Sequence, residues 1–200
     1  GAVVKKLARQ GLPVVIAGSP HKDAGLAYVD TDNYGGGKQA TQHLFNVGCK
    51  RVAAITGDTG ATAGRLRLDG FVSACKLNKY EVPSSYIAHG DYSFESGRDQ
   101  MTKLLAMKER PDGVCVANDL MAVGAIKAIR DAGFNCPEDI KIVGFDDSML
   151  AQTSRPELTS VRQDIEKLGE TVANLMISVI NGEKPQPIIL PTELVVRESA

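Results

Sequence analysis

The segment of residues 113–147 reads GVCVANDLMAVGAIKAIRDAGFNCPEDIKIVGFDD, and its pattern alone indicates the fold class. It opens with a short apolar run, residues 113–117, of the kind that forms a buried strand. Asp119 can cap the helix that a 3.6-residue apolar period predicts over residues 120–132. A second apolar run, residues 140–145, predicts another buried strand. This order predicts a parallel pair, because parallel strands need a crossover connection, usually a helix.

The same alternation of strand and helix runs through the rest of the sequence. Leu68, Phe71, Val72 and Cys75 recur at i, i+3, i+4 and i+7, which predicts an amphipathic helix. We therefore predict an α/β fold of parallel sheets flanked by helices. In such sheets a ligand lies beyond the carboxyl ends of the strands. The residues directly after each predicted strand are Asp32 and Asn33, residues 57–67, residues 90–92, Asn118 and Asp119, Asp146 and Asp147, and Gln163.

The composition is that of an ordinary globular protein. Its 200 residues, 43% of them hydrophobic, can bury a core without a disulfide or a metal. The net charge is −1, so we expect the chain itself to bind DNA poorly, since nucleic-acid surfaces are basic. Its four cysteines form no C-x-x-C pair, and no apolar run reaches the roughly 18 residues of a membrane span. We expect reduced thiols, a cytoplasmic protein and no membrane contact.

The sequence has few signs of catalysis. It contains no H-E-x-x-H, no G-x-S-x-G and no phosphate-binding G-x-x-x-x-G-K-[ST]. The glycine-rich residues 56–64 could hold a phosphate, but a turn that lets a ligand come close is the favoured interpretation. Asp146 and Asp147 are adjacent and could bind Mg²⁺, which leaves a metal-dependent enzyme as an alternative. We expect no enzymatic activity and no cofactor.

The polar residues at the predicted strand ends suit a polyhydroxylated ring. Asp146 supplies a carboxylate, and Asn118 and Gln163 supply amides. Either Arg65 or Arg67 supplies a guanidinium, since residues two apart on a helix point in different directions. Tyr92 offers an aromatic face on which the apolar side of a sugar can stack. Such a ring needs both hydrogen-bond donors and acceptors, and this set provides both.

Six motifs resemble those of the LacI/GalR family of transcriptional regulators. The resemblance runs in order from about residue 11 to the end, and the six together are specific although each alone is modest. The motifs are RLRLDGF at 65–71, GDYSFESG at 90–97, RPDGVCVANDLMAVG at 110–124, PEDI at 137–140 leading into VGFDD at 143–147, LTSVRQ at 158–163, and LPTELVVRES at 190–199.

The resemblance implies a two-lobed fold like that of the periplasmic sugar-binding proteins, with the ligand between the lobes. It implies a ligand-binding set of Arg67, Asn118 and Asp146 for hydroxyls, Tyr92 at the aromatic position, Gln163 on a crossover and Asp32 from the N-terminal lobe. Some relatives carry a further carboxylate where this chain has three glycines at 35–37, so the contacts of the N-terminal lobe differ here.

The resemblance also implies a division of the chain. We expect residues 1–47 and 164–191 to form an incomplete N-terminal lobe, and residues 48–162 and 192–200 to form the C-terminal lobe. The family's helix-turn-helix and the first elements of its N-terminal lobe are not in this sequence. We therefore expect that lobe to expose apolar surface and strand edge.

The implied function is effector sensing in a transcriptional regulator. A small polar effector, expected to be a sugar, would bind between the lobes and change operator binding by a full-length homodimer, which touches DNA only through the domain absent here. A purine effector stays open as well. The alternatives are a secreted sugar-binding protein of a transport system and the metal-dependent enzyme.

Overall fold

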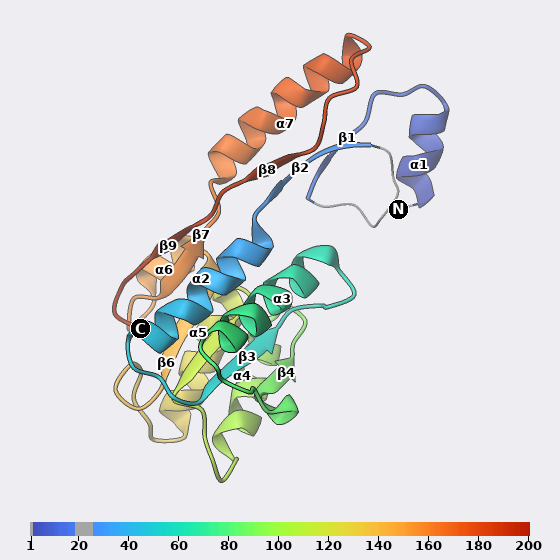
Figure 1. Ribbon diagram of the computed structural model, residues 1–200. Coiled ribbons are helices and arrows are strands. Elements are labelled where there is room, and N and C mark those ends of the chain that lie inside the picture. Colours follow the sequence, from blue (N-terminus) through green and yellow to red (C-terminus); the bar gives the residue numbers. More distant parts are fainter. Residues whose placement is uncertain (1, 19–25) are drawn as a thin grey trace.

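The computed structural model describes residues 2–18 and 26–200, and it contains two sheets joined by crossing segments (Figure 1). The small sheet and its helices comprise α1 (Ala2–Arg9), β1 (Val15–Ala17), β2 (Ala27–Thr31), α7 (Ile165–Ile180) and β8 (Ile188–Leu190). The large sheet and its helices comprise α2 (Asn33–Asn46), β3 (Val52–Thr56), α3 (Thr62–Leu77), the 3₁₀ turn η1 (Ser84–Tyr86), β4 (Ile87–His89), α4 (Phe94–Leu105), β5 (Gly113–Val116), α5 (Asp119–Asp131), β6 (Lys141–Asp146), α6 (Met149–Thr153), β7 (Thr159–Arg162) and β9 (Glu193–Val195). In these described ranges no helix combines the length and apolar character that a bilayer crossing requires.

The large sheet has the strand order β4-β3-β5-β6-β7-β9, and only β9 runs antiparallel to its neighbour. Its side chains alternate between two buried clusters. Val52 and Ala54 pack toward α2 and α3, whereas Ala53 and Ile55 pack toward α4 and α5. Both faces are thus covered, which explains why the predicted strands are apolar throughout instead of alternating with polar residues.

Two pairs of helices cover the large sheet, and glycines let each pair pack closely. A Cβ atom on Gly37 of α2 would overlap the backbone oxygen of Arg67 on α3, and one on Gly70 would overlap that of Tyr34. In the other pair, a Cβ on Gly97 of α4 would overlap the backbone of α5. The contact at Gly37 holds the part of α3 that carries Arg67 firmly against α2.

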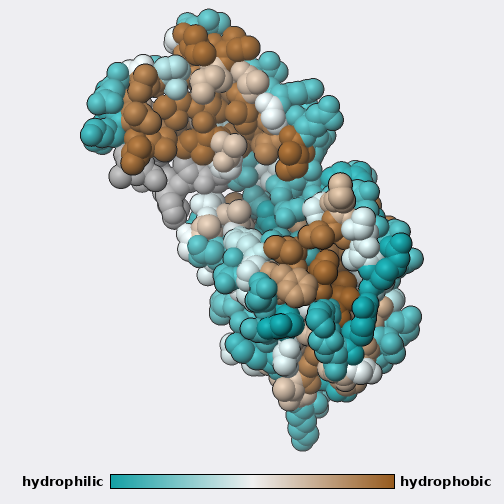
Figure 2. Space-filling model, turned by 180° about the vertical axis from the view of Figure 1, so that it is seen from behind, coloured by the Kyte–Doolittle hydropathy of each residue, from teal (hydrophilic) through white to brown (hydrophobic). Residues whose placement is uncertain are grey.

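The small sheet has the order β1-β2-β8, all parallel, with α7 packed across β1 and β2. It buries Val29 fully, yet Ile177 and Ile180 of α7 and Ile189 of β8 are each more than half exposed. Figure 2 shows a broad hydrophobic surface over this end of the molecule. The exposed apolar surface predicted for this part is therefore present.

Three crossing segments connect the two sheets: residues 31–33, 162–165 and 190–193. The first crossing segment, residues 31–33, precedes the predicted lobe boundary at residue 47. That boundary places α2 in the N-terminal lobe, but α2 packs on α3 and on the strands of the large sheet, where Ala40 and Leu44 are buried. The chain therefore changes sheets before α2 and not after it. The apolar stripe of a helix does not reveal which sheet it covers, which is why the sequence misplaced it.

Candidate functional site

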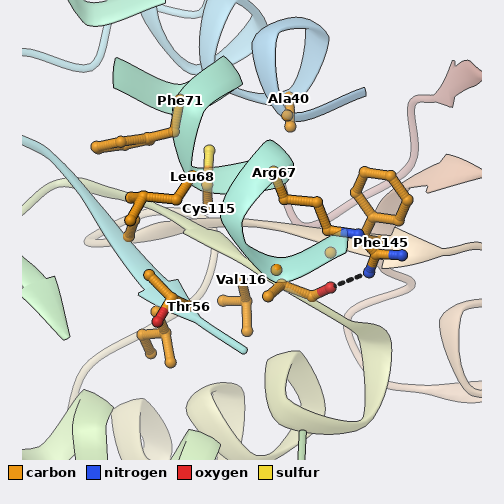
Figure 3. Close-up of a pocket in the computed structure, with 14 residues that line it drawn as sticks. Ala40, Thr56, Arg67, Leu68, Phe71, Cys115, Val116 and Phe145 are labelled. Atoms are coloured by element: carbon orange, nitrogen blue, oxygen red, sulfur yellow. Dashed lines mark hydrogen bonds between the residues drawn. The ribbon is translucent and has the colours of Figure 1, made fainter. Parts of the chain in front are cut away.

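The candidate site lies at the carboxyl edge of the large sheet, where β5 and β6 end. Arg67 reaches this edge from α3, and its guanidinium lies 3.6 Å from the centre of the Phe145 ring. Figure 3 shows the side chain extended along that ring, with its hydrogen bond to the backbone oxygen of Ala117. The cavity behind Arg67 has a volume of about 30 Å³. That is room for a water molecule and not for a sugar ring, so a ligand has to bind on the open side.

Arg67 is fixed by contacts from three directions. Its Nε donates to Oδ1 of Asn33 at 2.8 Å, and its Nη1 lies 3.5 Å from Oδ1 of Asp146. The side chain is only 11% exposed. Burial lowers the pKa of the Arg67 guanidinium, and the carboxylate of Asp146 opposes that change. Between Arg65 and Arg67, Arg67 is thus the arginine that faces the site, while Arg65 is exposed to solvent.

Asp146 stands at the end of β6 in an unusual backbone conformation, with φ of 110°. Its Oδ1 accepts a hydrogen bond from Nε2 of Gln163 at 2.6 Å, in addition to the contact with Arg67. Burial raises the pKa of the Asp146 carboxyl, and the guanidinium of Arg67 acts against it. The side chain keeps 37% of its surface exposed, so a ligand hydroxyl can reach the carboxylate.

Asn118 and Tyr92 occupy the next positions along the same edge. Asn118 caps α5, since its Oδ1 accepts from the backbone N–H of Met121 at 2.9 Å. Its Nδ2 donates to the backbone oxygen of Tyr92 at 3.2 Å. This bond connects the segment that follows β5 to the segment that follows β4. A Cβ on Gly57 would overlap the Tyr92 ring, so this glycine is required where the tyrosine packs on the glycine-rich loop.

Asp147 does not form a paired site with Asp146. Its carboxylate is 2% exposed and is held by Nε of Arg162 at 2.7 Å and Nη2 of Arg197 at 2.6 Å. The sequence-based alternative of a Mg²⁺ site on the two adjacent carboxylates is therefore wrong for Asp147, because both of its oxygens already serve an ion-pair cluster. In the described parts of the chain, no group of three or more His, Cys, Asp or Glu is placed to hold a metal ion.

The turn after β6 is held by Asp119, a buried residue that the sequence placed after a strand and predicted as the cap of α5, a role that Asn118 takes instead. Its carboxylate accepts from the backbone N–H and the hydroxyl of Ser148, at 2.7 and 2.9 Å, and from the hydroxyl of Ser160 at 2.6 Å. Burial raises the pKa of the Asp119 carboxyl to about 6, although these donors lower it. The bonds stabilise a turn in which Asp147 also has a positive φ, of 54°.

Asp32, the candidate from the N-terminal lobe, has a different place. It is the N-cap of α2, with Oδ1 accepting from the backbone N–H of Gly35 at 2.7 Å. The hydrogen bonds among Arg67, Asp146 and Gln163 do not include it. Its neighbour Asn33 contacts Arg67 instead. The signal for Asn33 was its position directly after a strand, which it shares with Asp32.

Comparisons with known proteins identify the family of this chain. A family model described as a periplasmic binding protein-like domain matches residues 41–200. The HTH-type transcriptional regulator CelR of Thermobifida fusca is 39% identical over 193 residues, which cover 94% of this chain and 57% of CelR. The ribose operon repressor of Escherichia coli (strain K12) is 40% identical over 142 residues, which cover 71% of this chain and 43% of that protein. Among solved structures, a transcriptional regulator CelR–cellobiose complex superposes with a TM-score of 0.93 at 38% identity, covering 97% of this chain and 61% of that one.

The chain belongs to the periplasmic binding protein-like domain family, in the branch found in LacI/GalR-type transcriptional regulators. These relatives are regulators, which favours effector sensing over the secreted transport protein considered from the sequence. The chain spans about half the length of the curated relatives it matches.

Proposed function

We propose that this chain is the effector-sensing part of a LacI/GalR-type regulator and that it binds a sugar between two lobes. The small-sheet lobe would comprise the described residues 2–18, 26–31 and 164–191, and the large-sheet lobe residues 32–163 and 192–200. The observation that carries the proposal is the convergence of Arg67, Asn118 and Asp146 at one sheet edge, beside two of the crossing segments.

The chemistry of this edge fits hydroxyl groups. The Arg67 guanidinium donates hydrogen bonds, the Asp146 carboxylate accepts them, and the Asn118 amide can do either. Each of these side chains is already oriented by the protein, so a ligand loses little affinity to ordering them. Tyr92 supplies an aromatic ring at the same edge, against which the apolar face of a sugar can pack.

Effector binding would act on DNA through the full-length protein. A sugar that contacts both lobes favours the lobe arrangement for which it has the higher affinity. In a full-length homodimer, this changes the spacing of two DNA-binding domains, and operator affinity shifts by a coupling free energy of roughly 1–3 kcal/mol. Operator DNA would be touched only by those domains, since this chain carries a net charge of −1.

Binding is favoured over catalysis by the state of the acidic residues. Asp147 is committed to Arg162 and Arg197, and Asp119 is committed to Ser148 and Ser160. Asp146 is the carboxylate left within reach of a ligand at this turn, and it already accepts from Gln163. Such an arrangement holds a hydroxyl without supplying a second group for acid–base chemistry.

The test is a thermal-shift screen of the chain against cellobiose, ribose, other sugars, sugar phosphates and purines. Cellobiose is the first probe, because the similar CelR was solved in complex with it. We expect a sugar to raise the Tm, since a ligand that binds only the folded state stabilises it by RT ln(1 + [L]/Kd).

The variants locate the binding site. Arg67→Ala and Asp146→Asn should abolish the shift, whereas Arg65→Ala, two residues from Arg67 on the same helix and exposed, should keep it. A shift that survives in both Arg67→Ala and Asp146→Asn would place the ligand elsewhere, and the absence of a shift with every sugar would contradict sugar sensing by this chain.

A further inference from the structure

Two effector-site side chains are each hydrogen-bonded to a crossing segment. Arg67 donates from Nε to Oδ1 of Asn33 at 2.8 Å, and Asp146 accepts from Nε2 of Gln163 at 2.6 Å. Thr31 joins the two crossing segments, because its Oγ1 donates to Oε1 of Gln163 at 2.7 Å. These five side chains form a continuous path that we call the crossing link: Asn33, Arg67, Asp146, Gln163 and Thr31.

The orientation of each amide in the crossing link is determined by its neighbours. Nδ2 of Asn33 lies 3.3 Å from both oxygens of Asp30 and 3.1 Å from the backbone oxygen of Thr31, so Oδ1 is the atom left to accept from Arg67. A carboxylate only accepts, so Gln163 must turn its Nε2 toward Asp146 and its Oε1 toward the Thr31 hydroxyl. Thr31 is 3% exposed and Asn33 is 1% exposed, so water hardly competes for these bonds.

We propose that Thr31 and Asn33 are positioning residues for the effector. Asn33 holds the Arg67 guanidinium in the orientation that meets the ligand, and Thr31 holds Gln163 so that it orients the Asp146 carboxylate. Thr31 ends the last small-sheet strand before the chain crosses, and so the direction of both ligand-binding side chains depends on where the small sheet lies. This inference rests on the proposed function, because it concerns the same site.

A matched pair of substitutions separates positioning from packing at Thr31. Thr31→Val keeps the shape of the side chain and removes the hydroxyl, whereas Thr31→Ser keeps the hydroxyl and removes a methyl group. With cellobiose as the probe in isothermal titration calorimetry, we expect Thr31→Val to weaken binding about fivefold, the effect of one neutral hydrogen bond. Thr31→Ser should restore binding to within about twofold of the wild type.

The control for losing a buried hydroxyl is Thr41→Val. Thr41 is fully buried in α2, and its hydroxyl donates to the backbone oxygen of Gly37, outside the crossing link. It should leave the affinity for cellobiose unchanged. If Thr31→Ser weakens binding as much as Thr31→Val, or if Thr31→Val has no effect, Thr31 acts through packing or not at all and the inference is overturned.

A double-mutant cycle tests the path through Gln163. In a Gln163→Ala background, Thr31→Val should cause no further loss of affinity, because the hydroxyl then has no amide to orient. Additive losses would show that Thr31 affects the site by another route and would contradict the crossing link.

A readout without ligand keeps the inference separate from the proposed function. If the wild type binds neither cellobiose nor any other sugar in the screen, the proposed function fails, and positioning is judged from the nuclear magnetic resonance signal of the Arg67 Nε–H. We expect that signal to be sharp and slow to exchange in the wild type and in Thr41→Val. It should exchange at least tenfold faster in Asn33→Ala, which removes its acceptor. An unchanged exchange rate in Asn33→Ala would overturn the role of Asn33.

Discussion

The large sheet and the small sheet differ in how completely their apolar side chains are buried. In the large sheet, helices cover both faces, and residues such as Leu158, Ile142 and Met121 have no exposed surface. Among the described residues, α7 is the helix that packs across the strands of the small sheet, and Ile177, Ile180 and Ile189 remain largely exposed. Figure 2 shows hydrophobic surface over this end of the molecule. The large sheet therefore holds most of the buried apolar side chains that the structure describes.

This difference also explains where the candidate site lies. Arg67, Asn118 and Asp146 are all mounted on elements of the rigid large sheet, so their geometry is set by a packed core. The small sheet reaches the site through Thr31 and, across the second crossing segment, through Gln163. Under the proposed function, a ligand at this edge would contact side chains of the large sheet and, through these bonds, depend on where the small sheet lies.

The largest effect that distinguishes the two sheets should come from a core truncation. Leu158→Ala should lower the free energy of unfolding by about 2–5 kcal/mol, because it leaves a cavity in the fully buried cluster of the large sheet. Ile180→Ala on α7, where the side chain is 63% exposed, should change it by less than about 0.5 kcal/mol. Urea denaturation of both variants measures the contrast, and equal losses would show that the small sheet is packed as tightly as the large one.

A pH-dependent effect should come next, from the buried carboxyl of Asp119. Because its pKa is raised to about 6 in the folded protein, the folded state binds the proton more tightly than the unfolded state does. This group's contribution to stability is thus full below pH 4 and is lost as the pH rises through 6. The difference can reach about 3 kcal/mol, at 1.36 kcal/mol for each unit of pKa shift.

Asp119→Asn removes that titration. In urea denaturation, the free energy of unfolding of this variant relative to the wild type should rise between pH 4 and pH 6. The prediction concerns this change with pH and not the difference at any one pH. A constant difference across this range would mean that Asp119 is not titrating there, and Asp99→Asn, an exposed carboxyl, serves as the comparison.

The smallest effect concerns two helical glycines. Gly97→Ala should destabilise the chain by roughly 1–3 kcal/mol, because the new Cβ would overlap the backbone of α5 at Met121. Gly169→Ala on α7 meets nothing within 4 Å and should stabilise the chain by about 0.5–1 kcal/mol through helix propensity. Thermal denaturation should show a lower Tm for Gly97→Ala and a higher Tm for Gly169→Ala. A stabilised Gly97→Ala would disprove the close packing of α4 on α5.

The sequence predicted the large sheet and most of its edge. Apolar runs and capping residues indicated β5, which ends shortly before Asn118, and β6, which ends at Asp146, and the rule that ligands bind at carboxyl ends then indicated the site. The resemblance selected Arg67 over Arg65, and the structure confirms that Arg67 is the one that faces Asp146.

Other features depend on contacts between distant residues, which a local pattern does not reveal. Nothing in the pattern around Asp146 and Asp147 shows that both adopt positive φ, so that their carboxylates have separate partners. Asp32 and Asn33 look equally suitable in the sequence, yet one caps α2 and the other contacts Arg67. The assignment of α2 to the wrong sheet has the same origin, since only tertiary packing decides it.

Hydrogen–deuterium exchange with and without cellobiose shows whether the ligand binds at the carboxyl edge of the large sheet. We expect cellobiose to slow exchange in peptides that contain Tyr92, Asn118 to Met121, and Asp146 to Ser148. Protection confined to the opposite, amino edge, at the groove lined by Asn135, Pro137 and Arg155, would contradict the account.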